Sequence, residues 1–437
     1  MLLVALISLF LQSQVSAAAS NVTGKQIPPV VHPTVGQTFK TNELQVTFVD
    51  RKSYYSGTPK NYIDKDVRSP KSVNIHPGQS KYYVNSLEGS KTVVYDIKTG
   101  EKLKVISHQL DEQHNDLWAP ESGFFKFNYK RSNQNHFTGK PVEGAFSHNG
   151  RYFWVPYYRR SYDLNAQDPS AMAVIDTERD TIIRLFETGP LPKMVAVSAD
   201  QTKLAVSHWG NNTVGIMDIS SNNPNDWKYV AKVVVDKELQ LNFSRTEKVD
   251  RDKNSGYSLR GTVFTPDGKY LFVGCMGGGG GIAVIDAANN RYLGRVVGTK
   301  PSLRHLIIKN GYIYASINAS GYVQRISLET FISKIQALNG QSCKLLTVSE
   351  WTSCKVPAGA RTIEMTPDGK YIFAACNFSS SLAVVNAETM KLIGTISADS
   401  YPVGLDVSKD GRYVLTTSQG REGRGGNSVN IFEIKYL

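Results

Sequence analysis

The chain repeats one short phrase, and this repeat limits its fold more than any other feature. The phrase is complete at residues 265–275 (TPDGKYLFVGC) and 366–376 (TPDGKYIFAAC), and looser copies occur elsewhere. An Asp-Gly turn between two β-rich runs is a hairpin signal. A hairpin that recurs at roughly 40–45 residues is typical of a propeller blade. The repeat therefore predicts an all-β chain built from such blades.

The number of repeats predicts seven blades. Each unit reads as two strands around the Asp-Gly turn, a loop, a third strand ending in an acid or Asn, and a fourth strand. Seven third strands can be counted, and the seventh unit stops at Leu437 before a fourth strand. A β-like run, Leu44–Phe48, stands unassigned near the N-terminus. We expect this run to complete the last blade and close the ring, because closure removes exposed sheet edges.

The repeat also resembles that of a known family. The pattern P-x-x-hydrophobic-x-hydrophobic-S-x-D-G, followed by a YVxN-like strand and NTVxxxD, is similar to the YVTN-repeat β-propellers. The best match is residues 193–219 (KMVAVSADQTKLAVSHWGNNTVGIMDI), and the resemblance extends from about residue 71 to residue 437. Blades 1, 2 and 5 depart from the pattern. The resemblance implies a relative of surface-layer proteins, exported bacterial binding proteins and lactonase-like enzymes, but fold alone assigns no chemistry.

The first residues read as an export signal. Residues 1–20 carry no charged side chain, Leu2–Leu11 is strongly apolar, and small residues follow at 15–19. This order suits signal-peptidase cleavage. We therefore predict a signal peptide over 1–19 and a single propeller domain over 20–437. No other segment approaches the length of a membrane span, so the expected location is the periplasm or the outside of the cell.

The charge balance points to acidic partners. The formal net charge is +12 at pH 7, which favours association with anions. The expected partners are an anionic small molecule, an acidic glycan or another cell-envelope protein. Nucleic acid is physically allowed, but an exported protein rarely meets it. No motif gives a reason to expect a cofactor.

Cysteine usage fits an oxidising compartment. Cys343 and Cys354 lie in one polar insert, and we predict a disulfide between them, worth about 3 kcal/mol on the chain-entropy model. Cys275 and Cys376 occupy the same repeat position in different blades. We do not expect these two to pair.

Long inserts are expected to gather on one face of the ring. Three of them, at 107–140, 236–259 and 336–360, are interpreted as connections between consecutive blades. Two more, at 158–171 and 419–427, join the second and third strands of a blade. Both kinds of connection emerge on the same face of a propeller. Because loops on a rigid scaffold usually carry the binding function, we predict that this face binds the partner.

The start of each inner strand points to the same place. The residue seven positions before the Asp of each Asp-Gly turn, with a one-residue adjustment in two blades, is basic in five blades: Lys71, Lys193, Arg260, Arg304 and Arg361. Blades 2 and 7 carry Val142 and Val403 instead. Such a ring suits an anion, and Arg can hold two oxygens at once. The alternative is that carboxylates or main-chain carbonyls already satisfy these cations.

The ends of the second strands are expected to stand beside this ring. They carry adaptable groups: Tyr157, His208, Cys275, Asn318, Cys376 and Ser418. Tyr158, Arg159, Arg160 and Trp209 follow just beyond. Aromatic residues mixed with arginines suit sugars, aromatic acids or nucleobases. They equally suit packing against the neighbouring insert.

Three patterns look like metal or phosphate sites. Residues 108–116 (HQLDEQHND) mix His with carboxylates but lack a His-x-x-x-His helix or a Cys pair. Residues 250–256 resemble a calcium loop whose Gly is one place late and whose twelfth position is Gly261, so the EF-hand pattern is not met. Gly277–Gly281 lacks the Lys-Ser/Thr ending of a phosphate loop. We expect no metal at any of these segments.

Three functions remain open at this point. The first is a non-enzymatic binding or scaffolding propeller that captures an anionic ligand or partner at the insert-rich face. The second is a lactonase-like hydrolase acting on a sugar lactone or ester, for which His208 and Glu143 are the only obvious base candidates. The third is a pure protein–protein interaction platform. We expect the first.

Overall fold

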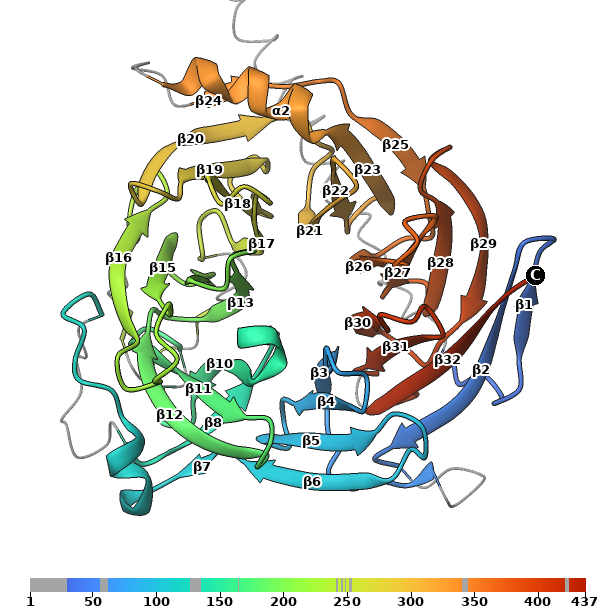
Figure 1. Ribbon diagram of the computed structural model, residues 1–437, viewed down its shortest axis with the longest axis horizontal. Coiled ribbons are helices and arrows are strands. Elements are labelled where there is room, and N and C mark those ends of the chain that lie inside the picture. Colours follow the sequence, from blue (N-terminus) through green and yellow to red (C-terminus); the bar gives the residue numbers. More distant parts are fainter. Residues whose placement is uncertain are drawn as a thin grey trace, which may run out of the picture.

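The chain folds as a ring of seven β-sheets. The computed structural model describes residues 30–437 except 56–61, 126–134, 164, 241–242, 245–246, 248, 251–253, 340–344 and 421–423. The sheets follow one another around a centre, and each has its first strand innermost except the sheet that begins with the short strand at residues 109–110 (Figure 1). The predicted seven-bladed β-propeller is thus confirmed. The predicted signal peptide lies outside the described residues.

The strands of the blades have the following bounds. Blade 1 holds β3 (Pro70–Ile75), β4 (Lys81–Ser86), β5 (Lys91–Asp96) and β6 (Lys102–Ser107). Blade 2 holds β7 (Gln109–Leu110), β8 (Phe137–Pro141), β9 (Ala145–Ser147), β10 (Tyr152–Arg160), β11 (Ser170–Asp176) and β12 (Thr181–Thr188). Blade 3 holds β13 (Pro192–Val197), β14 (Lys203–His208), β15 (Thr213–Asp218) and β16 (Lys228–Val234). Blade 4 holds β17 (Leu259–Phe264), β18 (Tyr270–Cys275), β19 (Ile282–Asp286), β20 (Arg291–Val297) and β24 (Leu345–Thr347).

The remaining blades complete the ring. Blade 5 holds β21 (Leu303–Lys309), β22 (Tyr312–Ile317), β23 (Tyr322–Ser327) and β25 (Thr352–Lys355). Blade 6 holds β26 (Ala360–Met365), β27 (Tyr371–Cys376), β28 (Ser381–Asn386) and β29 (Lys391–Ser397). Blade 7 holds β30 (Pro402–Val407), β31 (Tyr413–Ser418), β32 (Ser428–Tyr436), β2 (Leu44–Ser53) and β1 (Thr38–Lys40). The short helices are η2 (Glu112–Leu117), η4 (His148–Gly150), α2 (Leu328–Ile335) and η5 (Gln336–Leu338).

Hydrogen bonds within the turn explain why the phrase T-P-D-G-K-Y repeats. The Thr265 hydroxyl donates to the Asp267 carboxylate at 2.6 Å and accepts from the Tyr270 amide at 3.0 Å. The turn of blade 6 repeats these contacts from Thr366 at 2.6 and 3.1 Å. The turn glycine Gly268 has a φ of +69°, a conformation that favours glycine. The phrase is therefore a self-contained hairpin turn.

The N-terminal strand closes the ring, as predicted. β2 pairs antiparallel with β32 from Leu44 opposite Tyr436 to Ser53 opposite Ser428. Its fully buried Leu44, Val46 and Phe48 pack against blade 6. Strands β1, β2 and β32 run together at the right of Figure 1. The blade that ends the chain is thus completed by the segment that begins it.

A buried ion pair stabilises the closure of the ring between β2 and β32. The Arg51 guanidinium holds both oxygens of Asp399 at 2.9 Å, and both side chains are almost fully buried. His32 Nδ1 lies 2.9 Å from the same carboxylate. Ser428 and Asn430 of β32 each donate to Asp399 Oδ2 at 2.6 Å. One carboxylate from the end of blade 6 therefore joins the N-terminal segment to the C-terminal strand.

The Asp399 carboxylate makes the free energy of unfolding depend on pH in the acid range. Burial raises the pKa of Asp399, but the hydrogen bond from His32 and the charge of Arg51 outweigh it and hold the pKa below its ordinary value. The folded state therefore binds fewer protons than the unfolded state below about pH 4, and stability falls as the pH falls through the folded pKa. We expect the free energy of unfolding to exceed that of Asp399→Asn at pH 6, and the gap to narrow toward pH 3. Urea titrations across this range measure it, and a gap independent of pH would contradict the assignment.

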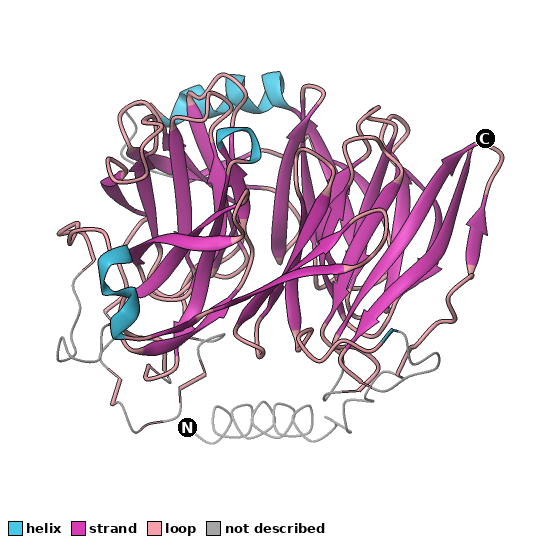
Figure 2. Ribbon diagram, turned by 60° about the horizontal axis from the view of Figure 1, so that its bottom comes forward, coloured by secondary structure: helices cyan, strands magenta, loops and turns pink. Residues whose placement is uncertain are grey.

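The insert at 336–360 differs from its predicted place. Its residues 352–355 form β25, which pairs with β23 as the outer strand of blade 5. The segment from α2 to β25 therefore joins the third and fourth strands of blade 5 and does not lead on to blade 6. It lies on the face opposite the other inserts, where α2 runs along the upper rim in Figure 2. The expectation that all long inserts share one face is wrong for this one.

Two further sequence predictions concern cysteines and membrane spans. Cys354 carries a buried free thiol in β25, and Cys343, its predicted partner, lies outside the described residues. The predicted disulfide is therefore not shown. Cys275 and Cys376 are also buried free thiols. Among the described residues, no helix has the length and apolar character needed to cross a bilayer.

Candidate functional site: a basic cluster around Glu143

The inner strands share a structural irregularity at the predicted basic position. In six of them the pairing with the second strand shifts register there, between residues 70 and 72, 192 and 194, 259 and 262, 303 and 305, 360 and 363, and 402 and 404. In blade 2, β8 and β9 are separated by residues 142–144. A bulge re-aims the side chain that it carries. The repeated bulge explains how side chains at the starts of different inner strands reach one centre.

Hydroxyl groups of neighbouring strands hold these bulges in place. The Ser207 and Ser316 side chains donate to the carbonyls of Arg260 and Arg361, at 3.2 and 2.5 Å, each across a blade boundary. Thr417 of blade 7 does the same for the Lys71 carbonyl at 3.2 Å. Each donor is the penultimate residue of a second strand. Buried carbonyls released by the bulges are thereby satisfied, which fixes the backbone under the basic side chains.

Glu143 lies in the middle of the basic residues. Its Oε1 is 3.5 Å from Arg260 Nη1, 3.9 Å from Lys71 Nζ and 4.0 Å from Arg361 Nη2. These three cations come from blades 4, 1 and 6. The exposed fractions of Lys71, Lys193, Arg260 and Arg361 are only 7%, 6%, 5% and 3%. We call the five basic residues and Glu143 the Glu143 cluster.

The pKa values show how strongly these groups interact. Burial and the charge of Arg361 lower the pKa of Lys71 well below its ordinary value, while Glu143 opposes the shift. Burial and Arg260 lower the pKa of Lys193 in the same direction. Burial raises the pKa of Glu143, but Lys71, Arg260 and Arg361 outweigh it and bring the pKa down to about 2. The cluster therefore holds one carboxylate among an excess of cations.

Aromatic and sulfur-containing side chains form one wall of the Glu143 cluster. Lys193 Nζ lies 3.8 Å from the ring centre of Tyr158 and 5.1 Å from that of Trp209. The Arg260 guanidinium lies 4.6 Å from the Trp209 ring. Arg304 Nη1 contacts the sulfur of Met276 at 3.1 Å. Cation–π contacts of this kind partly compensate the burial of the cations.

Some polar atoms of the Glu143 cluster have no hydrogen-bond partner among the described residues. These atoms are Oε2 of Glu143, Nη2 of Arg361 and Nε of Arg304, and all three are buried. Buried polar groups are normally hydrogen-bonded, and leaving one unsatisfied costs about 1–3 kcal/mol. The cluster thus offers donors and one acceptor that a bound molecule can use.

Five of the predicted ligand-binding residues meet in this cluster, and Trp209 joins them. Lys71, Lys193, Arg260, Arg304 and Arg361 are all coupled electrostatically to Glu143 or to one another. The Arg159 guanidinium lies 5.9 Å from the ring centre of Tyr158, the ring that also contacts Lys193. The predicted alternative is also partly met, because a carboxylate does face the cations. Sequence reasoning placed Val142 on the ring and Glu143 beside it, whereas the break between β8 and β9 places Glu143 itself among the cations.

The predicted second-strand residues pack between blades instead. The Tyr157 hydroxyl bonds His108 Nδ1 at 2.9 Å, and His108 Nε2 bonds the Thr92 hydroxyl at 2.8 Å. Asn318 donates to the Ala360 carbonyl at 3.3 Å. These side chains are at most 4% exposed, because the second strand lies between its neighbours and its side chains face the adjacent blade. Their hydrogen bonds thus go to neighbouring strands and not to the basic side chains.

His208 and Arg160 are occupied in the same way. His208 is fully buried, with Nε2 bonded to the Thr188 hydroxyl at 2.7 Å and Nδ1 to the Thr213 hydroxyl at 2.8 Å. Burial lowers its pKa to about 3. The Arg160 guanidinium, only 1% exposed, donates to the Ser170 carbonyl at 2.7 Å and stacks 4.8 Å from the ring centre of Phe137. Both residues therefore stabilise blade 2 and its boundary with blade 3.

The segments that resembled metal sites show no ligand set. Within the described residues, no group of three or more His, Cys, Asp or Glu side chains is placed to hold a metal ion. His108 is buried with Thr92 and Tyr157, whereas His114 pairs with Asp111 at 2.8 Å on the surface. The calcium-like segment falls partly outside the described residues. Gly277–Gly281 forms the turn between β18 and β19, where the Gly280 carbonyl accepts from Arg295.

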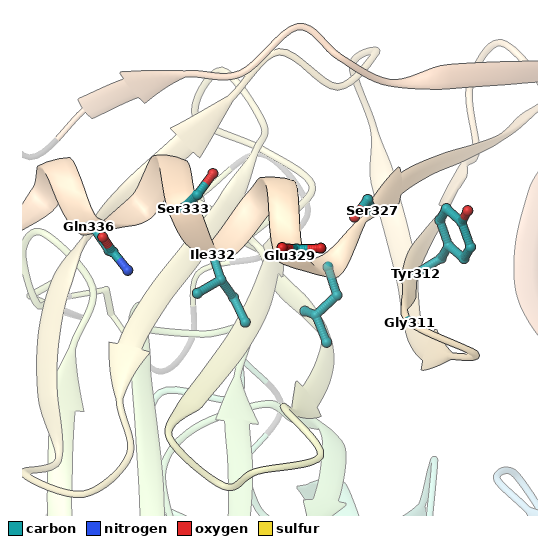
Figure 3. Close-up of a pocket in the computed structure, with 8 residues that line it drawn as sticks. Gly311, Tyr312, Ser327, Glu329, Ile332, Ser333 and Gln336 are labelled. Atoms are coloured by element: carbon teal, nitrogen blue, oxygen red, sulfur yellow. The ribbon is translucent and has the colours of Figure 1, made fainter.

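A pocket lies on the opposite face and is chemically different. It has a cavity volume of about 670 Å³ and lies between α2 and the first turn of blade 5. Figure 3 shows Ile332 of α2 and Gln336 of η5 on the side that faces the blade. Glu329 is its charged lining residue. A cavity of this charge does not suit an anion, so the Glu143 cluster remains the candidate site.

Comparison with known proteins supports the fold. A solved structure described as Kuenenia stuttgartiensis hydrazine synthase matches with a TM-score of 0.59 at 14% identity, covering 86% of this chain and 98% of that chain. The Cps50 (Swd1) β-propeller domain of Myceliophteria thermophila matches with a TM-score of 0.56 at 10% identity, covering 84% and 97%. Such low identities show the fold alone. No protein-family model and no curated protein matches the sequence, so the likeness to YVTN-repeat propellers stays a resemblance.

Proposed function

We propose that this chain is a binding propeller that captures a small anion at the Glu143 cluster. The observation that carries the proposal is the convergence of five cations from five blades, four of them buried, around a single carboxylate. Like charges repel more strongly as the effective dielectric falls, so the cluster is costly without further negative charge. A bound anion removes that cost. The proposal keeps the sequence-based expectation that binding takes place outside the cytoplasm.

The position of the cluster fits such a role. It stands at the starts of the inner strands, on the face that carries the inserts 107–140 and 236–259 and the loops 158–171 and 419–427. Tyr158 and Met276 are only partly buried beside it. Charged clefts with apolar walls concentrate ions of the opposite sign. Tyr158 and Met276 therefore give the cluster a partly exposed apolar border.

A hydrolytic function receives less support from the same residues. A general base works best when its pKa lies near the operating pH. The pKa of His208 is about 3 and that of Glu143 about 2, and both ring nitrogens of His208 are hydrogen-bonded. A lactonase would need another base. The interaction platform stays open as a role of the inserts, but it does not use the buried cations.

A thermal-shift titration tests the proposal. We expect phosphate, citrate, glucuronate or a related anion to raise the melting temperature saturably at fixed ionic strength. A ligand at 100 times its dissociation constant stabilises by about 2.7 kcal/mol. Arg260→Ala/Arg361→Ala should abolish the shift, because it removes two of the cations nearest Glu143. As a control, Arg291→Ala/Arg412→Ala removes two exposed surface charges and should leave the shift unchanged.

Two results would count against the proposal. One is the absence of a saturable shift with every anion. The other is a shift that the control double variant loses as fully as the cluster double variant, because binding would then follow the overall charge.

A further inference from the structure

We infer that the Glu143 cluster selects a phosphate group that carries a proton, and rejects sulfate. This inference rests on the proposed function and names the ligand chemistry of the same site. The group can be inorganic phosphate or the singly protonated form of a phosphomonoester. The cations supply the attraction, and Glu143 supplies the selectivity.

The arrangement of the cations favours a tetrahedral oxyanion. The basic residues come from blades 1, 3, 4, 5 and 6 and so approach the centre from several directions. A carboxylate has two oxygens in one plane, whereas phosphate and sulfate present four oxygens in three dimensions. Arginine pairs with such oxyanions through paired N–H groups. The unpartnered Nη2 of Arg361 and Nε of Arg304 are donors of the required kind.

The charge balance of the Glu143 cluster also favours a tetrahedral oxyanion over a monocarboxylate. Five cations face one carboxylate, and Glu143 remains ionised because those cations hold its pKa at about 2. A monocarboxylate would neutralise only part of the excess. An oxyanion with up to two negative charges neutralises more, in a site where the basic side chains are nearly or largely removed from water.

Glu143 then separates phosphate from sulfate. Its Oε2 is buried and has no hydrogen-bond partner among the described residues, and an ionised carboxylate can only accept hydrogen bonds. A ligand that fills the cluster must therefore donate to this oxygen. Protonated phosphate donates through its P–OH group, whereas sulfate has no proton at neutral pH and meets the carboxylate with repulsion. The two anions are otherwise close in size and shape.

Isothermal titration of the full mature chain with inorganic phosphate and sodium sulfate tests the inference. At pH 7 and fixed ionic strength, we expect phosphate to bind roughly 10- to 150-fold more tightly, the ratio that corresponds to a hydrogen bond to a charged group. Methyl phosphate separates the two sources of the group. Because the second pKa of a phosphomonoester is about 6, its affinity should fall between pH 5 and pH 8, whereas inorganic phosphate keeps a proton throughout.

Glu143→Gln tests the residue that selects. Glutamine has the shape of glutamate, but its NH₂ group donates and it carries no charge. We expect sulfate to bind the variant more tightly than it binds the natural protein, and the ratio between the two anions to fall below about threefold. Glu88→Gln removes the same charge from a surface pair with Lys140 and should keep the full ratio. If Glu143→Gln folds poorly, the variant can be refolded in sulfate before titration. The methyl phosphate pH series on the natural protein then tests independently whether the site selects a protonated phosphate group.

The outcomes separate this inference from the proposed function. Equal binding of sulfate and phosphate by the natural protein overturns the selectivity and leaves anion capture intact. Binding of neither anion, together with saturable binding of citrate or glucuronate, also overturns it. An unchanged ratio in Glu143→Gln removes Glu143 from the role. A failure of every anion to bind defeats the proposed function as well.

Discussion

Asp399→Ala should lower the free energy of unfolding by about 3–5 kcal/mol, because it leaves a buried cation without its partner. Arg51 is 3% exposed and holds both oxygens of Asp399 at 2.9 Å. The substitution also removes the acceptor of Ser428 and Asn430, so β2 and β32 lose a shared anchor. The free energy of unfolding of a folded domain is only about 5–15 kcal/mol, so a loss of this size is a large part of the total.

Urea unfolding together with hydrogen exchange measures this effect. We expect amides of β2 to lose protection before those of the inner strands, because closure of the ring depends on this segment. Glu433→Ala is the matched control: it removes a carboxylate on β32 whose partner, Arg412, is exposed, and exposed pairs contribute about 0–1 kcal/mol. A loss in Asp399→Ala no larger than in this control would show that the closure does not depend on the buried pair.

The fold could be predicted from the sequence because its information is local and repeated. The Thr-Pro-Asp-Gly turn makes its own hydrogen bonds, as Thr265 and Asp267 show. The unpaired strand Leu44–Phe48 followed from counting strands in a ring that must close. The outer strand of blade 5 could not be predicted from the sequence, because β25 is four residues long and three of its residues are exposed. A strand of that kind carries no alternating apolar pattern.

The site was predicted less completely, and the reason is register. Successive side chains of a strand face opposite ways, so a shift of one residue exchanges the buried and the site-facing set. The alignment of repeats gave the correct basic residue in five blades but chose Val142 over Glu143 in blade 2. The bulge that decides between them depends on donors such as Asn85, whose side chain bonds the Val142 carbonyl at 2.5 Å. That contact joins different blades and leaves no local pattern in the sequence.

The direction of side chains also explains why the second-strand residues make their contacts between blades. Tyr157, His208 and Asn318 were expected beside the ring because they end strands on the correct face of the propeller. A strand end on this face does not by itself direct its side chain toward the centre, because the side chains of a second strand face the neighbouring blades. The two ring nitrogens of His208 form hydrogen bonds with the Thr188 and Thr213 hydroxyls. A polar residue at such a strand end satisfies partners across the blade boundary as readily as it binds a ligand.

Glu143→Gln should destabilise the anion-free protein by about 3–5 kcal/mol at pH 7, because it removes the carboxylate from among buried cations. The loss should depend on pH with a definite sign. Burial and neighbouring cations lower the pKa values of Lys71 and Lys193, and Glu143 opposes both shifts. Without Glu143 these pKa values fall further, so as the pH rises toward the ordinary lysine pKa of about 10.4 the folded variant binds still fewer protons, relative to its unfolded state, than the folded natural protein does. The free energy of unfolding therefore rises with pH more steeply in the variant than in the natural protein, and the defect of the variant should shrink between pH 7 and pH 10.

Added sulfate should restore the Glu143→Gln variant while stabilising the natural protein much less, because an anion in the cluster replaces the missing negative charge. Chemical unfolding at pH 7 and pH 10, with sulfate or chloride at equal ionic strength, measures both effects. Glu88→Gln, which loses an exposed ion pair, should show neither. A defect that ignores pH and sulfate would reflect packing around residue 143. A defect that both of them relieve would reflect charge, and would mean that the cations of five blades are held together by negative charge at the centre of the ring.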